Sequence, residues 1–256
     1  MNDKAVVEYS VRDDVAYLVL DAPPLNILTA AMMNQITGCL EKARADRSLK
    51  AIALFSRGKA FSAGADVGEH RPEQAGEMIA AFSRMFEAFG ALDLPVVMGV
   101  HGAALGAGFE LAMMADVLVA TESATLGQPE IRLGFFAPVG VAWLPKLVGV
   151  HRAIEITCSG RAYSSLDMER WGLVSAVVAD DDLEAGIEAK VEDFRRASPL
   201  VLRMNVRLVR RLAGLPFEQA RREAEKVFLD ELMVTEDVRE GIASFFEKRR
   251  PQWKNC

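Results

Sequence analysis

Two glutamates set in apolar surroundings are the residues of this 256-residue chain best suited to chemistry. Glu110 lies in VHGAALGAGFELAMMADV, where a glycine-rich turn opens onto an apolar run. Glu130 follows a proline in TLGQPEIRLGF. Burial raises the pKa of a carboxyl group towards neutrality, where it can act as a general acid or base. Two such groups facing one small space could hold a water and divide proton removal from proton delivery.

Two turns built of small residues are candidates for binding an anionic oxygen. Gly106-Ala107-Gly108 lies between a predicted strand and a predicted helix, where unpaired backbone N–H groups favour negative charge. The turn also resembles half of a dinucleotide fingerprint, but Leu111 stands where glycine or alanine is needed. AFSAGAD, residues 60–66, is a second such turn. Tight packing alone is the alternative explanation for both turns.

Alternating strand-like and helix-like segments must position these turns, and their alternation predicts an α/β layered fold. The predicted strands are AVVEYSV, VAYLVLDAP, KAIALFSR, LPVVMGVHG and DVLVATES. The predicted helices are AAMMNQITGCLEKARAD, capped by Thr29, then EQAGEMIAAFSRMFEAFGAL and FELAMMAD. From the helix start at Ser198-Pro199, only helical periodicity continues to the end. We therefore predict an α/β core over residues 1–196 and a helical region over residues 197–256.

Composition excludes several classes of protein. The net charge of −6 argues against non-specific nucleic-acid binding. The charge is uneven, because residues 203–256 hold 12 Lys and Arg against 9 Asp and Glu. This basic excess is explained either by a solvated helical face or by a site for an anionic ligand. The N-terminus resembles neither a signal peptide nor a membrane span. Three scattered cysteines and three histidines predict a cytoplasmic protein without a metal site.

Taken together, the motifs resemble those of the crotonase, or enoyl-CoA hydratase/isomerase, superfamily over nearly the whole chain. The strongest stretches are AFSAGAD, GAALGAGFELAMMADVLVA, LGQPEIRLG and TEDVREGIASFFEKRRPQW. The resemblance implies a spiral of ββα repeats with a C-terminal helical trimerisation region, assembled as a homotrimer or a dimer of trimers. It also implies an acyl-CoA thioester substrate, with coenzyme A as part of that substrate and no separate cofactor.

The resemblance also implies roles for individual residues. By motif position, the backbone N–H groups of Ala65 and Ala107 match an oxyanion hole for the thioester oxygen, and Glu110 and Glu130 match the acid/base pair of water-adding members. The further substrate-binding positions that it implies are Ala63, Gly64, Asp66, Gly106, Phe245 and Lys248. The last two would reach the CoA nucleotide from a neighbouring subunit, although a core phenylalanine and a solvated lysine are the alternative interpretation.

The segment GFFAPVGVAWLPKLVG, residues 134–149, departs from the glycine-rich segment of typical hydratases. Phe136 and Pro138 are expected to line the substrate pocket, and Phe135 and Trp143 add to its bulk unless these aromatic residues pack in the core. Combined with the PPLN motif, this segment looks most like the cyclohexa-1,5-diene-1-carbonyl-CoA hydratases of aromatic acid degradation. The departure leaves open which groups bind the CoA phosphates.

The leading hypothesis is therefore an acyl-CoA hydratase. The nearest alternative is a double-bond isomerase, in which a carboxylate moves a proton and no water adds. An NAD-dependent oxidoreductase that uses the glycine turn is a more distant alternative. A non-catalytic RNA-binding or scaffold protein is disfavoured by the acidic core and by the lack of interleaved basic and aromatic residues.

Overall fold

A six-stranded sheet forms the centre of the computed structural model, which describes residues 5–71 and 73–256. The strands lie in the order β1 (Val7–Arg12), β2 (Val15–Leu20), β3 (Ala51–Ser56), β4 (Val96–Val100), β6 (Val117–Thr121) and β9 (Ala176–Val178). Among the described pairs of this six-stranded sheet, only β1 and β2 are antiparallel. A smaller sheet contains β5 (Ala103–Leu105), β7 (Thr125–Gly127) and β8 (Ala162–Ser164). The predicted α/β class and all five predicted strands are confirmed.

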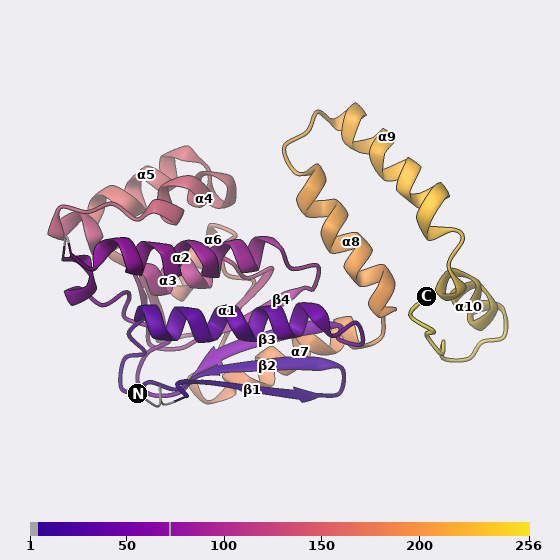
Figure 1. Ribbon diagram of the computed structural model, residues 1–256, viewed down its shortest axis with the longest axis horizontal. Helices are drawn as coiled ribbons and strands as arrows, with labels where there is room; N and C mark the ends of the chain where they lie inside the picture. The colour runs from indigo at the N-terminus through magenta and orange to yellow at the C-terminus, as the bar shows by residue number, and fades with distance from the viewer. Residues whose placement is uncertain (1–4, 72) are drawn as a thin grey trace.

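The sheet is covered on both faces, which explains why its central strands are apolar throughout. All residues of β2 and β4 are buried, as expected of parallel strands between two layers of helices. The larger core contains residues of α1 (Ala30–Ala45), α2 (Ala75–Gly90) and α3 (Ala107–Ala112). A smaller core lies between the sheet and α7 (Leu183–Arg195). Figure 1 shows α1 and α2 together on one side of the strands and α7 on the other.

Helix boundaries follow local hydrogen bonding. The Thr29 hydroxyl accepts the N–H of Met32, as the predicted cap requires. Helix α3 is shorter than the predicted FELAMMAD run, and that prediction is wrong beyond Ala112. The reason is Asp116, whose backbone N–H bonds the Val96 carbonyl at 2.9 Å while its carboxylate accepts the Val96 N–H at 2.8 Å. These bonds hold the chain at the start of β4 and end the helix.

Short helical segments join the strands and the longer helices along the chain. They are η1 (Gly68–His70), η2 (Pro129–Leu133), α4 (Pro138–Val148), α5 (Val150–Ser159), α6 (Ser165–Arg170) and η3 (Asp180–Asp182). Helix α4 is built from the aromatic segment that departs from typical hydratases, with Pro138 in its first turn. The sequence analysis assigned no helix there.

The C-terminal region is helical, as predicted, up to residue 246. It contains α8 (Pro199–Leu212), α9 (Phe217–Val227), the π-helical η4 (Phe228–Leu232) and α10 (Glu236–Phe246), which extend away from the sheet in Figure 1. Ser198 caps α8 by accepting the N–H of Val201. The helical prediction is wrong for residues 247–256, and the last of these fold back so that the buried Asp237 carboxylate accepts the N–H groups of Lys254 and Asn255.

Within the described part of the chain, no helix combines the length and apolar character needed to span a bilayer.

A buried arginine ties the C-terminal helices to the α/β core. Arg203 of α8 is 1% exposed and forms an ion pair with Asp93, which follows α2. Its guanidinium also donates to the carbonyls of Arg44 and Asp46 at the end of α1. A second cation, Arg47, pairs with Asp93 at 3.0 Å. The buried guanidinium of Arg203 therefore joins α8 to the end of α1 and to the residue that follows α2.

Replacing Arg203 by alanine is expected to lower the free energy of unfolding by about 3–5 kcal/mol, because Asp93 would stay buried without its main partner. Denaturant titration followed by circular dichroism measures this change. Arg207→Ala is the matched control, since Arg207 is exposed on the same helix, and it should change the free energy by less than about 0.5 kcal/mol. Equal effects of the two substitutions would contradict the anchoring role of Arg203.

Candidate active site

A cavity of about 620 Å³ lies between α2, the two small-residue turns and the segment from η2 to the start of α4. It brings together most of the residues that the sequence analysis selected. The predicted residues that line it are Ala63, Gly64, Ala65, Gly106, Ala107, Glu110, Glu130, Phe136 and Pro138. The cavity therefore joins the two turns, both glutamates and the unusual aromatic segment in one space.

Backbone hydrogen bonds hold the two turns side by side. The N–H of Ser62 donates to Ala103 at 3.1 Å, and the N–H of Leu105 donates back to Ser62 at 3.0 Å. Gly64 has φ 109°, and a Cβ there would lie 3.0 Å from the Leu105 carbonyl oxygen and 3.8 Å from the Ala107 nitrogen. Glycine is needed at this position because of both the backbone angle and the close approach.

Two backbone N–H groups beside this contact are available to a ligand. The bridge between Leu28 and Ala65 uses the N–H groups of Leu28 and Asp66, which leaves that of Ala65 outside the pairing. Ala107 is the first residue of α3, so its N–H has no partner within the helix. Both residues line the cavity. An oxygen bound there would meet two donors from neighbouring turns.

Glu110 is 2% exposed, although it carries an ionisable group. The N–H of Gly140, in the first turn of α4, donates to its Oε1 at 2.8 Å. Burial raises the pKa of Glu110 to about 7; the N–H groups of Gly140 and Val139 oppose that rise, and the charge of Glu130 adds to it. At neutral pH this carboxyl is therefore populated in both its protonated and its ionised form.

Glu130, in η2, is less buried than Glu110 and faces the same cavity. Burial raises its pKa, while its own backbone N–H and the positive charge of His70 oppose the rise. Gly106 has φ 55°, and a Cβ there would lie 2.7 Å from Oε1 of Glu130. The carboxylate therefore occupies space that only a glycine at position 106 leaves open.

Gln128 is a residue of the site that the sequence analysis missed. It is 1% exposed, and its side-chain amide, oriented so that nitrogen rather than oxygen meets Glu130, donates to Oε1 and Oε2 at 2.9 and 2.8 Å. An amide donor placed against both oxygens favours the ionised carboxylate. The signal available in the sequence was the amide side chain two positions before the glutamate in QPE.

The aromatic residues that line the cavity match the prediction only in part: Phe135 and Phe136 line it, and Trp143 does not. Phe135 and Phe136 line the cavity with 44% and 68% exposed, so they do not pack in the core. The ring of His70, a second residue that the sequence analysis missed, lies 5.4 Å from that of Phe135. Trp143 is not among the lining residues, and Lys146 lies over its ring at 4.9 Å.

Three predicted substrate-binding residues lie outside this cavity. Asp66 turns into its own loop, where its carboxylate accepts the N–H of Gly68 at 2.6 Å. Phe245 is 78% exposed at the end of α10, and Lys248 follows that helix. Within a single chain the structure does not bring Phe245 and Lys248 to the cavity.

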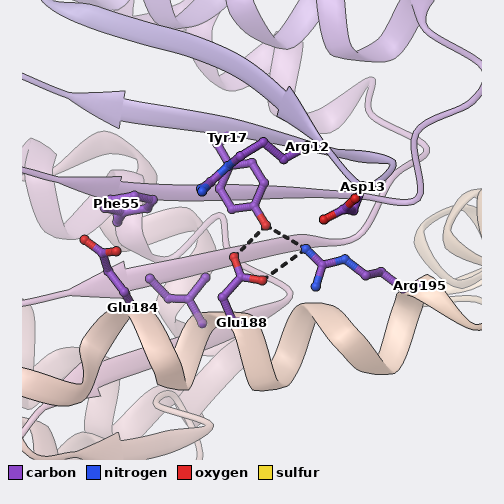
Figure 2. Close-up of a pocket in the computed structure, with 8 residues that line it drawn as sticks. Arg12, Asp13, Tyr17, Phe55, Glu184, Glu188 and Arg195 are labelled. Atoms are coloured by element: carbon purple, nitrogen blue, oxygen red, sulfur yellow. Dashed lines mark hydrogen bonds and ion pairs between the residues drawn. The ribbon is translucent and has the colours of Figure 1, made fainter.

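A smaller cavity of about 180 Å³ lies on the α7 side of the sheet and contains none of the predicted site residues. Figure 2 shows its closed network: the Tyr17 hydroxyl donates to Glu188 at 2.5 Å and accepts from Arg195 at 2.8 Å. Burial, together with Glu188, raises the pKa of Tyr17 to about 12. Since Tyr17 of β2 bonds both Glu188 and Arg195 of α7, we interpret the network as a link between β2 and α7.

In residues 5–71 and 73–256, no group of three or more His, Cys, Asp or Glu side chains is arranged to hold a metal ion.

Comparison with known proteins gives one consistent family. Residues 10–256 match the family model described as enoyl-CoA hydratase/isomerase. The chain is 34% identical over 238 residues to a cyclohexa-1,5-dienecarbonyl-CoA hydratase of Thauera aromatica, covering 93% of this chain and 92% of the relative. It is 32% identical over 255 residues to a probable enoyl-CoA hydratase of Bacillus subtilis, covering 97% and 98% of the two chains.

Solved structures agree with this assignment. An enoyl-CoA hydratase of Mycobacterium smegmatis aligns with a TM-score of 0.91 at 32% identity, over 98% of this chain and 99% of that one. An enoyl-CoA hydratase of Bacillus anthracis aligns with a TM-score of 0.93 at 26% identity, over 98% and 100% of the two chains. The predicted crotonase-type fold is therefore confirmed, and the chain belongs to the enoyl-CoA hydratase/isomerase family of the crotonase superfamily.

Proposed function

We propose that this protein is an acyl-CoA hydratase, which adds water across a double bond conjugated to a CoA thioester. The observation that carries the proposal is the shared cavity, in which Glu110 and Glu130 face the two turns that present the N–H groups of Ala65 and Ala107. Family membership supports an acyl-CoA substrate, and the relatives named hydratases support water as the group added.

In the proposed mechanism, the thioester carbonyl oxygen accepts hydrogen bonds from Ala65 and Ala107. Attack of the water oxygen on the β-carbon moves electron density onto the carbonyl oxygen, which becomes an enolate. The two N–H groups stabilise that charge more strongly in the transition state than in the bound substrate. One glutamate takes a proton from the water and the other delivers a proton to the α-carbon, so the elements of one water are added.

The different environments of the two carboxyl groups suit this division. Glu110 has a pKa of about 7, so protonating or ionising it costs little at neutral pH. Burial raises the pKa of Glu130, whereas the amide of Gln128 and the positive charge of His70 favour its ionised form. A pair that holds one proton between them can both remove and supply protons.

We also propose that residues 197–256 form the trimerisation region, and that the protein is a cytoplasmic homotrimer or dimer of trimers. The C-terminal helices extend from the core (Figure 1) and expose large apolar side chains, which favours contact with another subunit. These side chains include Leu229, Val234, Phe245 and Phe246. Phe245 and Lys248 would then contact the coenzyme A moiety of a substrate bound by a neighbouring subunit, with no separate cofactor.

For the acyl group, we propose a cyclic dienoyl thioester. The rings of Phe135 and Phe136 line the cavity that the glutamates share, and Pro138 fixes the backbone angle beside them. A flat, rigid acyl group loses little conformational freedom on binding beside such rings. The Thauera aromatica relative, named for a substrate of this kind, supports the same class.

Glu110→Gln and Glu130→Gln are each expected to lower kcat by about 10²–10⁴-fold, the usual contribution of a general acid or base. Substrate affinity should change far less, because both carboxyls act on the water. Product mass tests the reaction itself: hydration adds one water, whereas isomerisation leaves the mass unchanged. A variant that keeps nearly full turnover would remove its glutamate from the mechanism.

Gly106→Ala is expected to lower kcat by about 10²-fold or more, because the new Cβ would displace the Glu130 carboxylate from its position. Gly172→Ala is the matched control: Gly172 also has a positive φ, 80°, but a Cβ there meets nothing within 4 Å. Steady-state kinetics and thermal melts on both variants distinguish the effect of backbone strain from the effect of the clash between the new Cβ and Glu130. Equal activities would show that the clash with Glu130 is unimportant.

A cyclic dienoyl-CoA is expected to have a higher kcat/KM than crotonyl-CoA, because the aromatic wall favours a flat acyl group. Both substrates are measured on one enzyme preparation. If crotonyl-CoA is turned over equally well or better, the cyclic substrate class is wrong. The hydratase proposal would survive that result, since it rests on Glu110, Glu130 and the backbone donors.

A further inference from the structure

The PPLN motif, residues 23–26, ends in a buried polar side chain that the proposed mechanism does not use. This residue, Asn26, is 0% exposed. A buried amide has to be hydrogen-bonded, because an unpaired polar group in the interior is costly. The partners of Asn26 therefore show which parts of the chain the motif joins.

The side-chain amide of Asn26 joins two segments that are distant in the sequence. Its Nδ2 donates to the carbonyls of Arg57 and Ala60, at 2.6 and 2.8 Å. Its Oδ1 accepts the N–H of Ala22 at 2.8 Å. Both amide hydrogens are thus used, and the two carbonyls and the N–H fix the orientation of the amide. Asn26 ties the segment after β2 to the loop after β3, at the first residue of the AFSAGAD turn.

The backbone of the motif adds to this support. Asn26 has φ 48°, in the left-handed region that asparagine tolerates better than most residues do. Its N–H donates to the Ala22 carbonyl at 3.0 Å. The carbonyl of the preceding residue, Leu25, accepts the N–H of Ala63 at 2.9 Å. The motif therefore holds the AFSAGAD turn at its start through a side chain and at Ala63 through the backbone.

Leu28, two residues after the motif, orients the peptide unit that carries the proposed oxyanion donor. Its N–H donates to the Gly64 carbonyl at 2.9 Å, and its carbonyl accepts the N–H of Asp66 at 3.3 Å. The C=O and N–H groups of a planar trans peptide unit point in opposite directions. Because Leu28 holds the Gly64 carbonyl, the N–H of Ala65 in the same peptide unit points away from Leu28, and Ala65 lines the cavity.

We propose that Asn26 is a positioning residue that sets the direction of the Ala65 N–H in the oxyanion hole, a role that rests on the proposed hydratase function. Asn26 is not among the residues that line the cavity, so it acts only through the turn. Donors in such a site stabilise charge because they are held in place before the charge develops. A small change in their direction therefore lowers the rate more than it lowers substrate binding.

Asn26→Asp tests the support of the turn without substrate. The aspartate keeps Oδ1 for the N–H of Ala22 and tolerates the same φ, but it has no hydrogens to donate to the Arg57 and Ala60 carbonyls. Amide hydrogen exchange of residues 60–66, followed by mass spectrometry, should become about tenfold faster or more, because two hydrogen bonds to the loop are lost. Peptides from the C-terminal helices should exchange as in the wild type.

The carbonyl of a bound thioester tests the direction of the donor. Butyryl-CoA, labelled with ¹³C at the thioester carbonyl, is saturated and has no double bond to hydrate. In infrared difference spectra of the wild type, hydrogen bonds from the oxyanion hole should lower the carbonyl stretching frequency, and Asn26→Asp should lose most of this shift. In steady-state assays kcat should fall by about 10–10²-fold, less than the roughly 10²–10³-fold expected from removing one donor outright, while KM changes little.

Asn255→Asp is the matched control. Asn255 also has a left-handed φ, 59°, and its Nδ2 donates to the Arg47 carbonyl at 2.9 Å, but it does not line the cavity. This variant should leave the exchange of residues 60–66, the carbonyl band and kcat unchanged. If Asn26→Asp does not fold, Asn26→Gly, which permits the same φ without an amide, has the same expected results. A wild-type carbonyl band in the Asn26 variants would overturn the proposal, and faster exchange alone would leave Asn26 as structural support only.

The same measurements distinguish the role of Asn26 from the proposed function. A wild type that lowers the carbonyl frequency of butyryl-CoA, but adds water to no enoyl-CoA, would refute the hydratase function. The carbonyl band of the Asn26 variants would then still decide the positioning role. A wild type that leaves the carbonyl frequency unchanged would refute the oxyanion hole, and the positioning role of Asn26 with it.

Discussion

The pairing of the Ser62 turn with β5 is the interaction on which the site depends. Two backbone hydrogen bonds bring Gly64 against the start of α3, and the same contact places Ala65 and Ala107 on one wall. No side chain forms this pairing, so the need for small residues in both turns is steric rather than chemical. The glutamates are attached to the same framework, because Glu110 lies within α3 and Glu130 fits against Gly106.

The sheet separates this chemistry from the rest of the chain. The candidate active-site cavity lies on the side of α2 and α3, whereas α7 closes the opposite face with a core of its own. On that face the buried hydroxyl of Tyr17 donates to Glu188 and accepts from Arg195. These hydrogen bonds link β2 to α7. Ordinary apolar packing thus supports the framework, and Gly64 and Gly106, which both have positive φ, line the cavity.

Much of this arrangement was readable in the sequence, because periodicity and caps report local structure. The five strands, the Thr29 cap and the start of α8 were predicted from such signals. The early end of α3 was not, since it depends on bonds between Asp116 and Val96 that no local pattern encodes. Gln128 and His70 were missed for a related reason: the amide of Gln128 meets Glu130 and His70 lines the cavity, and only the folded chain shows these positions.

The burial of Glu110 also affects the stability of the fold. Its pKa of about 7 in the folded chain is above the ordinary value of 4.5, so the folded state binds this proton more tightly than the unfolded state does. The free energy of unfolding that it contributes is fully present below the ordinary value and is lost as pH rises through about 7. At alkaline pH the chain must keep an ionised carboxylate in an apolar wall, at a cost of roughly 3 kcal/mol. Alkaline tolerance and the proposed proton transfer at neutral pH are therefore opposing demands on one side chain.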